Sequence, residues 1–95
     1  MSKYIISAVR SFELEPIDNR KSFYGKCKVF EMEDGSKVLR SYNTYVCKID
    51  PNKTFHKTWD GYSPTTMRHI NAFLDYYGIK GGGKKWWENL PCEDY

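Results

Sequence analysis

The segment that decides the fold spans residues 59–74 and reads WDGYSPTTMRHINAFL. Ser63 and Pro64 have the form of a helix N-cap and first helical residue, because serine accepts from an unpaired amide and proline has no amide to leave unpaired. Gly78 supplies a left-handed stop. Between these signals, apolar residues recur every three or four positions, which places them on one helix face: Met67, Ile70, Phe73, Leu74 and Tyr77. The pattern predicts a helix over residues 64–77.

The residues that precede this helix predict an antiparallel sheet. Alternating or β-rich segments indicate strands at residues 3–9, 23–32, 38–42 and 54–59, with the third continuing to Ile49 after a kink at Asn43-Thr44. In that continuation, Tyr45, Cys47 and Ile49 are expected to share one face. Residues 13–20 read as a loop, Asp34-Gly35 as a hairpin turn, and residues 50–53 as a second turn.

The residues that follow the helix predict a short closing element. Three glycines at residues 81–83 are expected to form a flexible joint, and residues 84–90 a short helix that ends before Pro91. Strands followed by helices are typical of an α+β fold. We therefore expect one domain over residues 1–95, with a small antiparallel β-sheet packed against the main helix and a short C-terminal helix.

Composition narrows the class of protein. Of the 95 residues, 40% are apolar and 17% aromatic, which is sufficient for one modest core. The net charge of +3 is small and spread along the chain, so it does not by itself indicate a nucleic-acid partner. Three distant cysteines define no disulfide framework, and no segment resembles a signal peptide or a membrane span. We expect a cytoplasmic protein without membrane contact.

Three segments carry a family resemblance: SYNTYV at residues 41–46, WDGYS at 59–63 and TTMRHINAFL at 65–74. They resemble a family of small proteins encoded by phages, plasmids and integrated elements of Gram-positive bacteria. The tail KKWWENLPCE at residues 84–93 is similar to the usual ending of that family, so the likeness covers residues 38–93. The family is a domain of unknown function. The resemblance implies a compact fold and a gene carried by a phage, plasmid or integrated element in a bacterial host cell. It supplies no catalytic residues.

No segment has the residues and spacing of a catalytic, metal or cofactor site. Residues 78–84 match the start of a phosphate-binding loop, but Lys85 replaces the required hydroxyl and a helix precedes the loop. The lysines of this segment could still hold a phosphate without chemistry. His69 has no companion at ligand or base spacing and reads as a surface or capping histidine. Cys27 and Cys47 fit core packing. We expect no enzyme, no metal and no cofactor.

The first functional hypothesis is a small phage or mobile-element accessory protein that binds and modulates a host macromolecule. A host protein or ribonucleoprotein is the expected partner, and anti-defence roles such as anti-CRISPR inhibition fall within this class. Trp86 and Trp87 either cover the sheet edge or leave one ring as a contact anchor, since tryptophan is enriched where binding energy concentrates. The candidate partner-binding residues are Arg68, His69, Lys84, Lys85, Trp86 and Trp87.

The alternative hypothesis is an accessory protein that binds single-stranded or structured nucleic acid. Basic and aromatic residues interleave on the expected sheet, as they do where bases stack and phosphates are neutralised. The same pattern also keeps the wet face of an antiparallel sheet soluble. The candidate residues are Lys26, Lys28, Arg40, Tyr42 and Lys48. Assembly with further copies of the chain stays open. An enzyme ranks last, and it would need His69 or His56 to take part.

Overall fold

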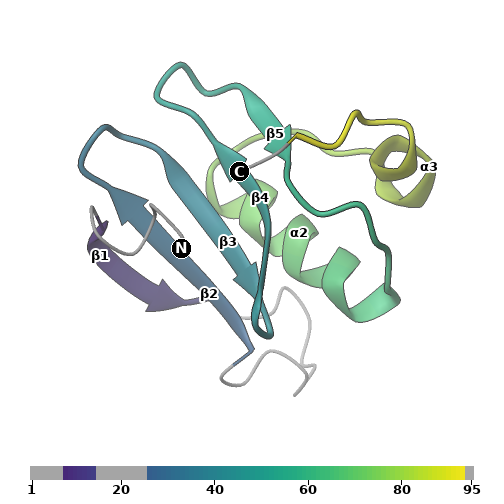
Figure 1. Cartoon of the computed structure of the whole chain (residues 1–95), viewed down its shortest axis with the longest axis horizontal. Helices are drawn as coiled ribbons and strands as arrows, with labels where there is room; N and C mark the ends of the chain where they lie inside the picture. The colour runs from purple at the N-terminus through teal and green to yellow at the C-terminus, as the bar shows by residue number, and fades with distance from the viewer. Residues whose placement is uncertain (1–7, 15–25, 94–95) are drawn as a thin grey trace.

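The structure, a computed structural model, describes residues 8–14 and 26–93. These residues form five strands and two helices: β1 (Ala8–Glu13), β2 (Cys27–Met32), β3 (Lys37–Ser41), β4 (Thr44–Ile49), β5 (Phe55–Lys57), α2 (Pro64–Tyr76) and α3 (Gly83–Glu88). The strands pair antiparallel in chain order and make one sheet. In Figure 1, α2 lies across one face of this sheet and α3 lies beyond β5. The predicted α+β fold is confirmed.

Helix α2 follows the local signals in the sequence. The Ser63 hydroxyl accepts a hydrogen bond from the Thr66 amide at 3.0 Å, and Pro64 opens the first turn. At the other end Gly78 has a φ of 70°, and the Ile79 amide donates to the Leu74 carbonyl at 2.9 Å. An N-terminal side-chain cap such as that of Ser63 stabilises a helix by about 1 kcal/mol. The predicted start and glycine stop are confirmed, and the helix ends at Tyr76 rather than at residue 77.

The hairpin between β3 and β4 corrects the expected kink at Asn43-Thr44. The chain reverses completely there, because Ser41 pairs with Thr44 and only Tyr42 and Asn43 lie between them. Tyr42 takes a φ of 57°, a region that bulky side chains seldom adopt. The turn carries no glycine, the residue that usually marks such a reversal, so the sequence pattern did not reveal it.

A β-bulge in β4 also corrects the expected face of Tyr45. Leu39 pairs with Cys47, but the next residue of β3, Arg40, pairs with Tyr45, so Val46 is inserted between the two pairs. An inserted residue shifts the alternation of side chains along a strand. Tyr45 therefore packs on the face opposite Cys47, and the prediction that they share a face is wrong.

The N-terminal strands differ from expectation in their bounds. Of the strand expected at residues 3–9, residues 8 and 9 are described and belong to β1, which continues to Glu13, a residue that was expected in a loop. Residues 3–7, 15–20 and 23–25 of the predicted elements lie outside the described residues. The hairpin turn at Asp34-Gly35 is confirmed, with Gly35 at a φ of 95°.

The two faces of the sheet have different neighbours. The main core lies between the sheet and α2, and it also takes in Trp87 of α3. On the opposite face Phe30, Met32 and Val38 form a smaller apolar cluster, against which Ala8 and Tyr45 pack. Cys27 and Cys47 are both buried in the main core, as their apolar alternation predicted.

The glycine joint before α3 is closely packed. A Cβ atom on Gly82 would stand 2.5 Å from the Trp86 Cβ, and one on Gly81 would stand 2.7 Å from the Leu74 Cδ1. Only a residue without a side chain permits these approaches. The glycines therefore bring α3 against the end of α2, a steric role that the expected flexible joint did not include.

Candidate functional site

The resemblance segments converge on a buried hydrogen-bonded group. The Ser41 hydroxyl, at the end of β3, lies 2.7 Å from the His69 Nδ1 and 3.1 Å from the Thr66 Oγ1, both on α2. Ser41 is 2% exposed and His69 is completely buried. The interpretation of His69 as a surface or capping histidine is therefore wrong, because its partner comes from a strand 28 residues earlier.

This group fixes one element to another. A serine hydroxyl beside an imidazole is also the pairing of a nucleophile and its base, but a nucleophile needs substrate to reach it. Here the hydroxyl and the ring are sealed inside the core. Buried polar groups of this kind stabilise the fold only when they are bonded to one another. Their role is to hold the β3–β4 hairpin against α2.

The turn above this group presents an aromatic ring to solvent. Tyr42 is 44% exposed, and its ring centroid lies 5.7 Å from that of His69. The Lys26 ammonium lies 5.6 Å from the Tyr42 centroid. We call Lys26, Tyr42 and Asn43 the tip surface. A tyrosine at positive φ lowers the free energy of unfolding by about 1–3 kcal/mol. Other contacts of the fold must offset this cost to hold the Tyr42 ring in place.

The residues predicted to bind a partner fall on two helices. On α2, Arg68 is half-buried and has no hydrogen bond or ion pair to the described part of the chain, whereas His69 has no exposed surface. On α3, Lys84 and Lys85 are exposed, Trp86 is half-buried against Phe55, and Trp87 lies in the core. Of these six predicted residues, Arg68, Lys84, Lys85 and part of Trp86 therefore offer surface to a partner.

The residues predicted to bind nucleic acid divide between two places. Lys28, Arg40 and Lys48 lie on the sheet face opposite α2, whereas Lys26 and Tyr42 belong to the tip surface. Lys28 and Arg40 each lie 5.5 Å from the centroid of the Phe30 ring. Phe30 itself is only 8% exposed, which leaves no open ring face on which a base could stack.

A buried lysine, Lys57, was not singled out from the sequence. Lys57 is 3% exposed, and its ammonium donates to the carbonyls of Trp87 at 2.9 Å and Leu90 at 3.3 Å. Asp60 supplies a carboxylate 3.6 Å away. The indole of Trp87 in turn donates to the Gly61 carbonyl at 2.8 Å. These bonds attach α3 to the β5 edge, and their partners are too distant in sequence to be read from a local pattern.

A second group of residues missed from the sequence lies where β1 meets the end of α2. Glu31 accepts from Tyr77 at 2.7 Å and pairs with Arg10 at 3.0 Å. Burial, followed by the hydrogen bond and charge of the Glu31 carboxylate, raises the pKa of Tyr77.

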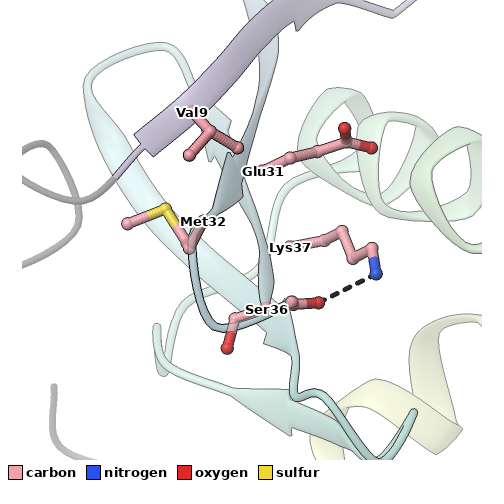
Figure 2. A pocket seen from close by; sticks show the side chains of 6 residues that line it. Val9, Glu31, Met32, Ser36 and Lys37 are labelled. Carbon is pink, nitrogen blue, oxygen red and sulfur yellow. Dashed lines mark hydrogen bonds between the residues drawn. The ribbon is translucent and has the colours of Figure 1, made fainter.

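Beside this group is a shallow hollow of about 260 Å³, shown in Figure 2, which is lined by Val9, Glu31, Met32, Gly35, Ser36 and Lys37. Its lysine already donates to the Gly35 carbonyl at 2.8 Å, so the hollow offers few unpaired polar groups.

The thiols of the core are poorly suited to chemistry. Burial, with a smaller effect of Glu13, raises the pKa of Cys27 to about 12, and burial raises the pKa of Cys47 well above its usual value. A thiolate, which is the reactive form, is disfavoured at both positions.

Among the described residues, no group of three or more His, Cys, Asp or Glu is arranged to hold a metal ion. In the same part of the chain, neither helix is long and apolar enough to cross a bilayer.

Comparison with known proteins gives one match. The model of a family described as a family of unknown function, DUF8033, matches residues 12–89. No curated protein and no solved structure matches the chain significantly. The matched range contains both the buried Ser41–Thr66–His69 group and the tip surface.

Proposed function

We propose that this chain, which belongs to the DUF8033 family of unknown function over residues 12–89, is a small binding protein that recognises and modulates a host macromolecule. The partner is a host protein or ribonucleoprotein. The setting in a phage or mobile element, and with it an anti-defence role such as CRISPR inhibition, rests on the resemblance in residues 38–93. The chain acts by binding and not by catalysis.

The observation that supports a binding role is the conformation of Tyr42. Its ring is exposed although its backbone is strained, and the residues below it are fully buried and hydrogen-bonded. Tyrosine is enriched among the residues that dominate binding energy, because it offers a large contact area with few rotatable bonds. A ring fixed before binding loses little entropy when a partner arrives. We therefore place the centre of the binding site at the tip surface.

The same geometry argues against a hydrolytic or thiol enzyme. Ser41 and His69 are hydrogen-bonded to each other, but both are buried, so a substrate cannot reach them. Cys27 and Cys47 are buried with raised pKa values. These four buried residues thus serve packing.

The test is an affinity capture of tagged protein from a lysate of a Gram-positive bacterium, with and without nuclease, read by mass spectrometry. The decisive variant is Tyr42→Asn, because asparagine tolerates positive φ and so removes the ring without adding backbone strain. We expect a nuclease-resistant protein partner with the native chain and a loss of at least about tenfold in its recovery with Tyr42→Asn, the scale of a hot-spot residue.

The matched control is Tyr76→Asn, which removes a second tyrosine that is well exposed among the described residues, at the far end of α2. Recovery of the partner should be unchanged in this control. Equal recovery by the native chain and Tyr42→Asn would refute the tip surface as the site. Recovery of no partner under any condition would refute the binding role itself.

A second candidate function is nucleic-acid binding, favoured by the basic face that Lys28, Arg40 and Lys48 share. Its affinity should fall steeply with salt, because each neutralised phosphate releases counterions. Fluorescence anisotropy with single-stranded and hairpin oligonucleotides at low salt tests this directly. Lys28→Gln combined with Lys48→Gln should then reduce both the affinity and the salt slope, whereas an absence of binding to any oligonucleotide excludes this function.

A further inference from the structure

His56 lies between two carboxylates that come from different parts of the chain. Its Nε2 is 2.8 Å from an Asp50 oxygen, in the turn before β5, and its Nδ1 is 2.7 Å from a Glu93 oxygen. A carboxylate only accepts hydrogen bonds, and a neutral imidazole carries one donor. Both contacts are hydrogen bonds only when the ring is the doubly protonated imidazolium, so the geometry selects the charged form.

The Glu93 side of this arrangement belongs to a segment that covers the β5 edge. Lys57 and Cys92 form a parallel β-bridge, and the Glu93 amide donates to the Lys57 carbonyl at 2.7 Å. An open strand edge presents unpaired backbone groups to other chains. Residues 91–93, which we call the strap, therefore occupy backbone positions at which another strand could pair.

We propose that the strap is a pH-sensitive cover of the β5 edge, closed by protonated His56 and released when the imidazolium loses its proton. On deprotonation one ring nitrogen keeps its proton and can donate to only one carboxylate. The other nitrogen then directs its lone pair at a carboxylate oxygen, which is repulsive. Asp50 is held in place by two backbone amides, those of Asn52 and Thr54, so Glu93 is the partner that leaves.

The charges around His56 set the direction of the effect. The hydrogen bonds to Asp50 and Glu93 raise the pKa of His56 above its usual value, with burial opposing them. Lys48, which pairs with His56 across the sheet, places a positive charge that also opposes protonation. A raised pKa in the folded state means that the stabilisation is fully present below the unfolded pKa and is lost as the pH rises through the folded one. The strap is thus closed in acid and opens in mild alkali.

The experiment follows two signals by NMR between pH 5 and 9: the titration of the His56 ring, and the protection of the Glu93 amide from hydrogen exchange, corrected for the intrinsic rate. We expect the pKa of His56 to be higher in the native chain than in the Glu93→Gln variant, because the variant lacks one of the two carboxylates beside the ring. By linkage, the protection of the Glu93 amide should fall as the pH rises through the His56 titration. The fall should be about tenfold for each unit by which the His56 pKa of the native chain exceeds that of the Glu93→Gln variant.

The matched control is Glu88→Gln, which neutralises an exposed glutamate in α3 that has no hydrogen bond or ion pair to the described residues. Its His56 titration and strap protection should equal those of the native chain. Two results would overturn the proposal: a Glu93 amide whose protection does not change through the His56 titration, or a Glu93→Gln variant with the native His56 pKa. Both Glu93→Gln and Glu88→Gln change exposed residues, so loss of folding does not obscure the result.

Discussion

Replacing Ser41 with alanine should destabilise the protein far more than the loss of one oxygen atom suggests. The Ser41 hydroxyl is the contact between the Thr66 hydroxyl and the His69 ring, at 3.1 and 2.7 Å. All three side chains are buried, so solvent cannot replace the missing partner. Ser41→Ala therefore leaves the Thr66 hydroxyl and the His69 Nδ1 without the hydrogen-bond partner that Ser41 provides.

The size of the effect follows from the cost of such groups. A buried polar atom without its partner costs about 1–3 kcal/mol. Thr66 can rotate its hydroxyl toward its own helix, so most of the cost falls on His69, and we expect a loss of about 2 kcal/mol. In a domain of this length each kcal/mol corresponds to about 4–8 °C, so the midpoint of thermal unfolding should fall by about 8–16 °C.

The assay is urea unfolding followed by tryptophan fluorescence, for which the buried Trp87 is a suitable reporter. The matched control is Ser36→Ala: this serine is also buried, but its side chain bonds to the exposed Asp34 carboxylate, which water can solvate when the hydroxyl is lost. Ser36→Ala should stay within about 0.5 kcal/mol of the native chain. If Ser41→Ala is as stable as Ser36→Ala, the reasoning that the buried group fixes the β3–β4 hairpin to α2 is refuted.

Three further predictions concern other residues. At Tyr42, asparagine should be more stable than valine by about 1–2 kcal/mol in urea unfolding, because a β-branched residue resists positive φ. Lys57→Met should cost about 2–4 kcal/mol by the same assay, since the Leu90 carbonyl loses its ammonium donor and the buried Trp87 carbonyl keeps the Leu90 amide but loses the ammonium; an unchanged midpoint would contradict this. At pH 8 a thiol reagent should modify only Cys92 in the folded chain, because the burial that raises the pKa of Cys27 and Cys47 also blocks access; mass spectrometry should find one adduct before urea and three after.

The parts of the fold that sequence predicted are those fixed by neighbouring residues. The cap at Ser63, the proline after it and the glycine stop act within a few positions of one another, and the predicted helix accordingly agrees with α2 to within one residue. The prediction that Cys27 and Cys47 fit core packing is also confirmed, because it depends only on the period of a strand.

The parts that sequence missed depend on residues far apart in the chain. Burial of His69 requires Ser41, and burial of Lys57 requires the carbonyls of Trp87 and Leu90, so neither follows from a local pattern. The reversal at Tyr42 escaped notice because strain there is offset by tertiary packing and not by a turn-forming residue. Of the candidate site, Tyr42 and Lys26 were identified, but only for nucleic acid, and the support beneath them was not anticipated.

The sequential pairing of the five strands has a consequence for how the chain folds during synthesis. Each strand meets its neighbour as soon as the next one emerges, and contacts between sequence neighbours form quickly. The apolar face of the growing sheet, however, is covered by α2 and by Trp87 of α3, and Lys57 finds its carbonyl partners only when residues 87–90 have appeared. A nascent chain therefore exposes the apolar face of its strands until residues 64–90 have emerged, and it is most prone to aggregate during that interval.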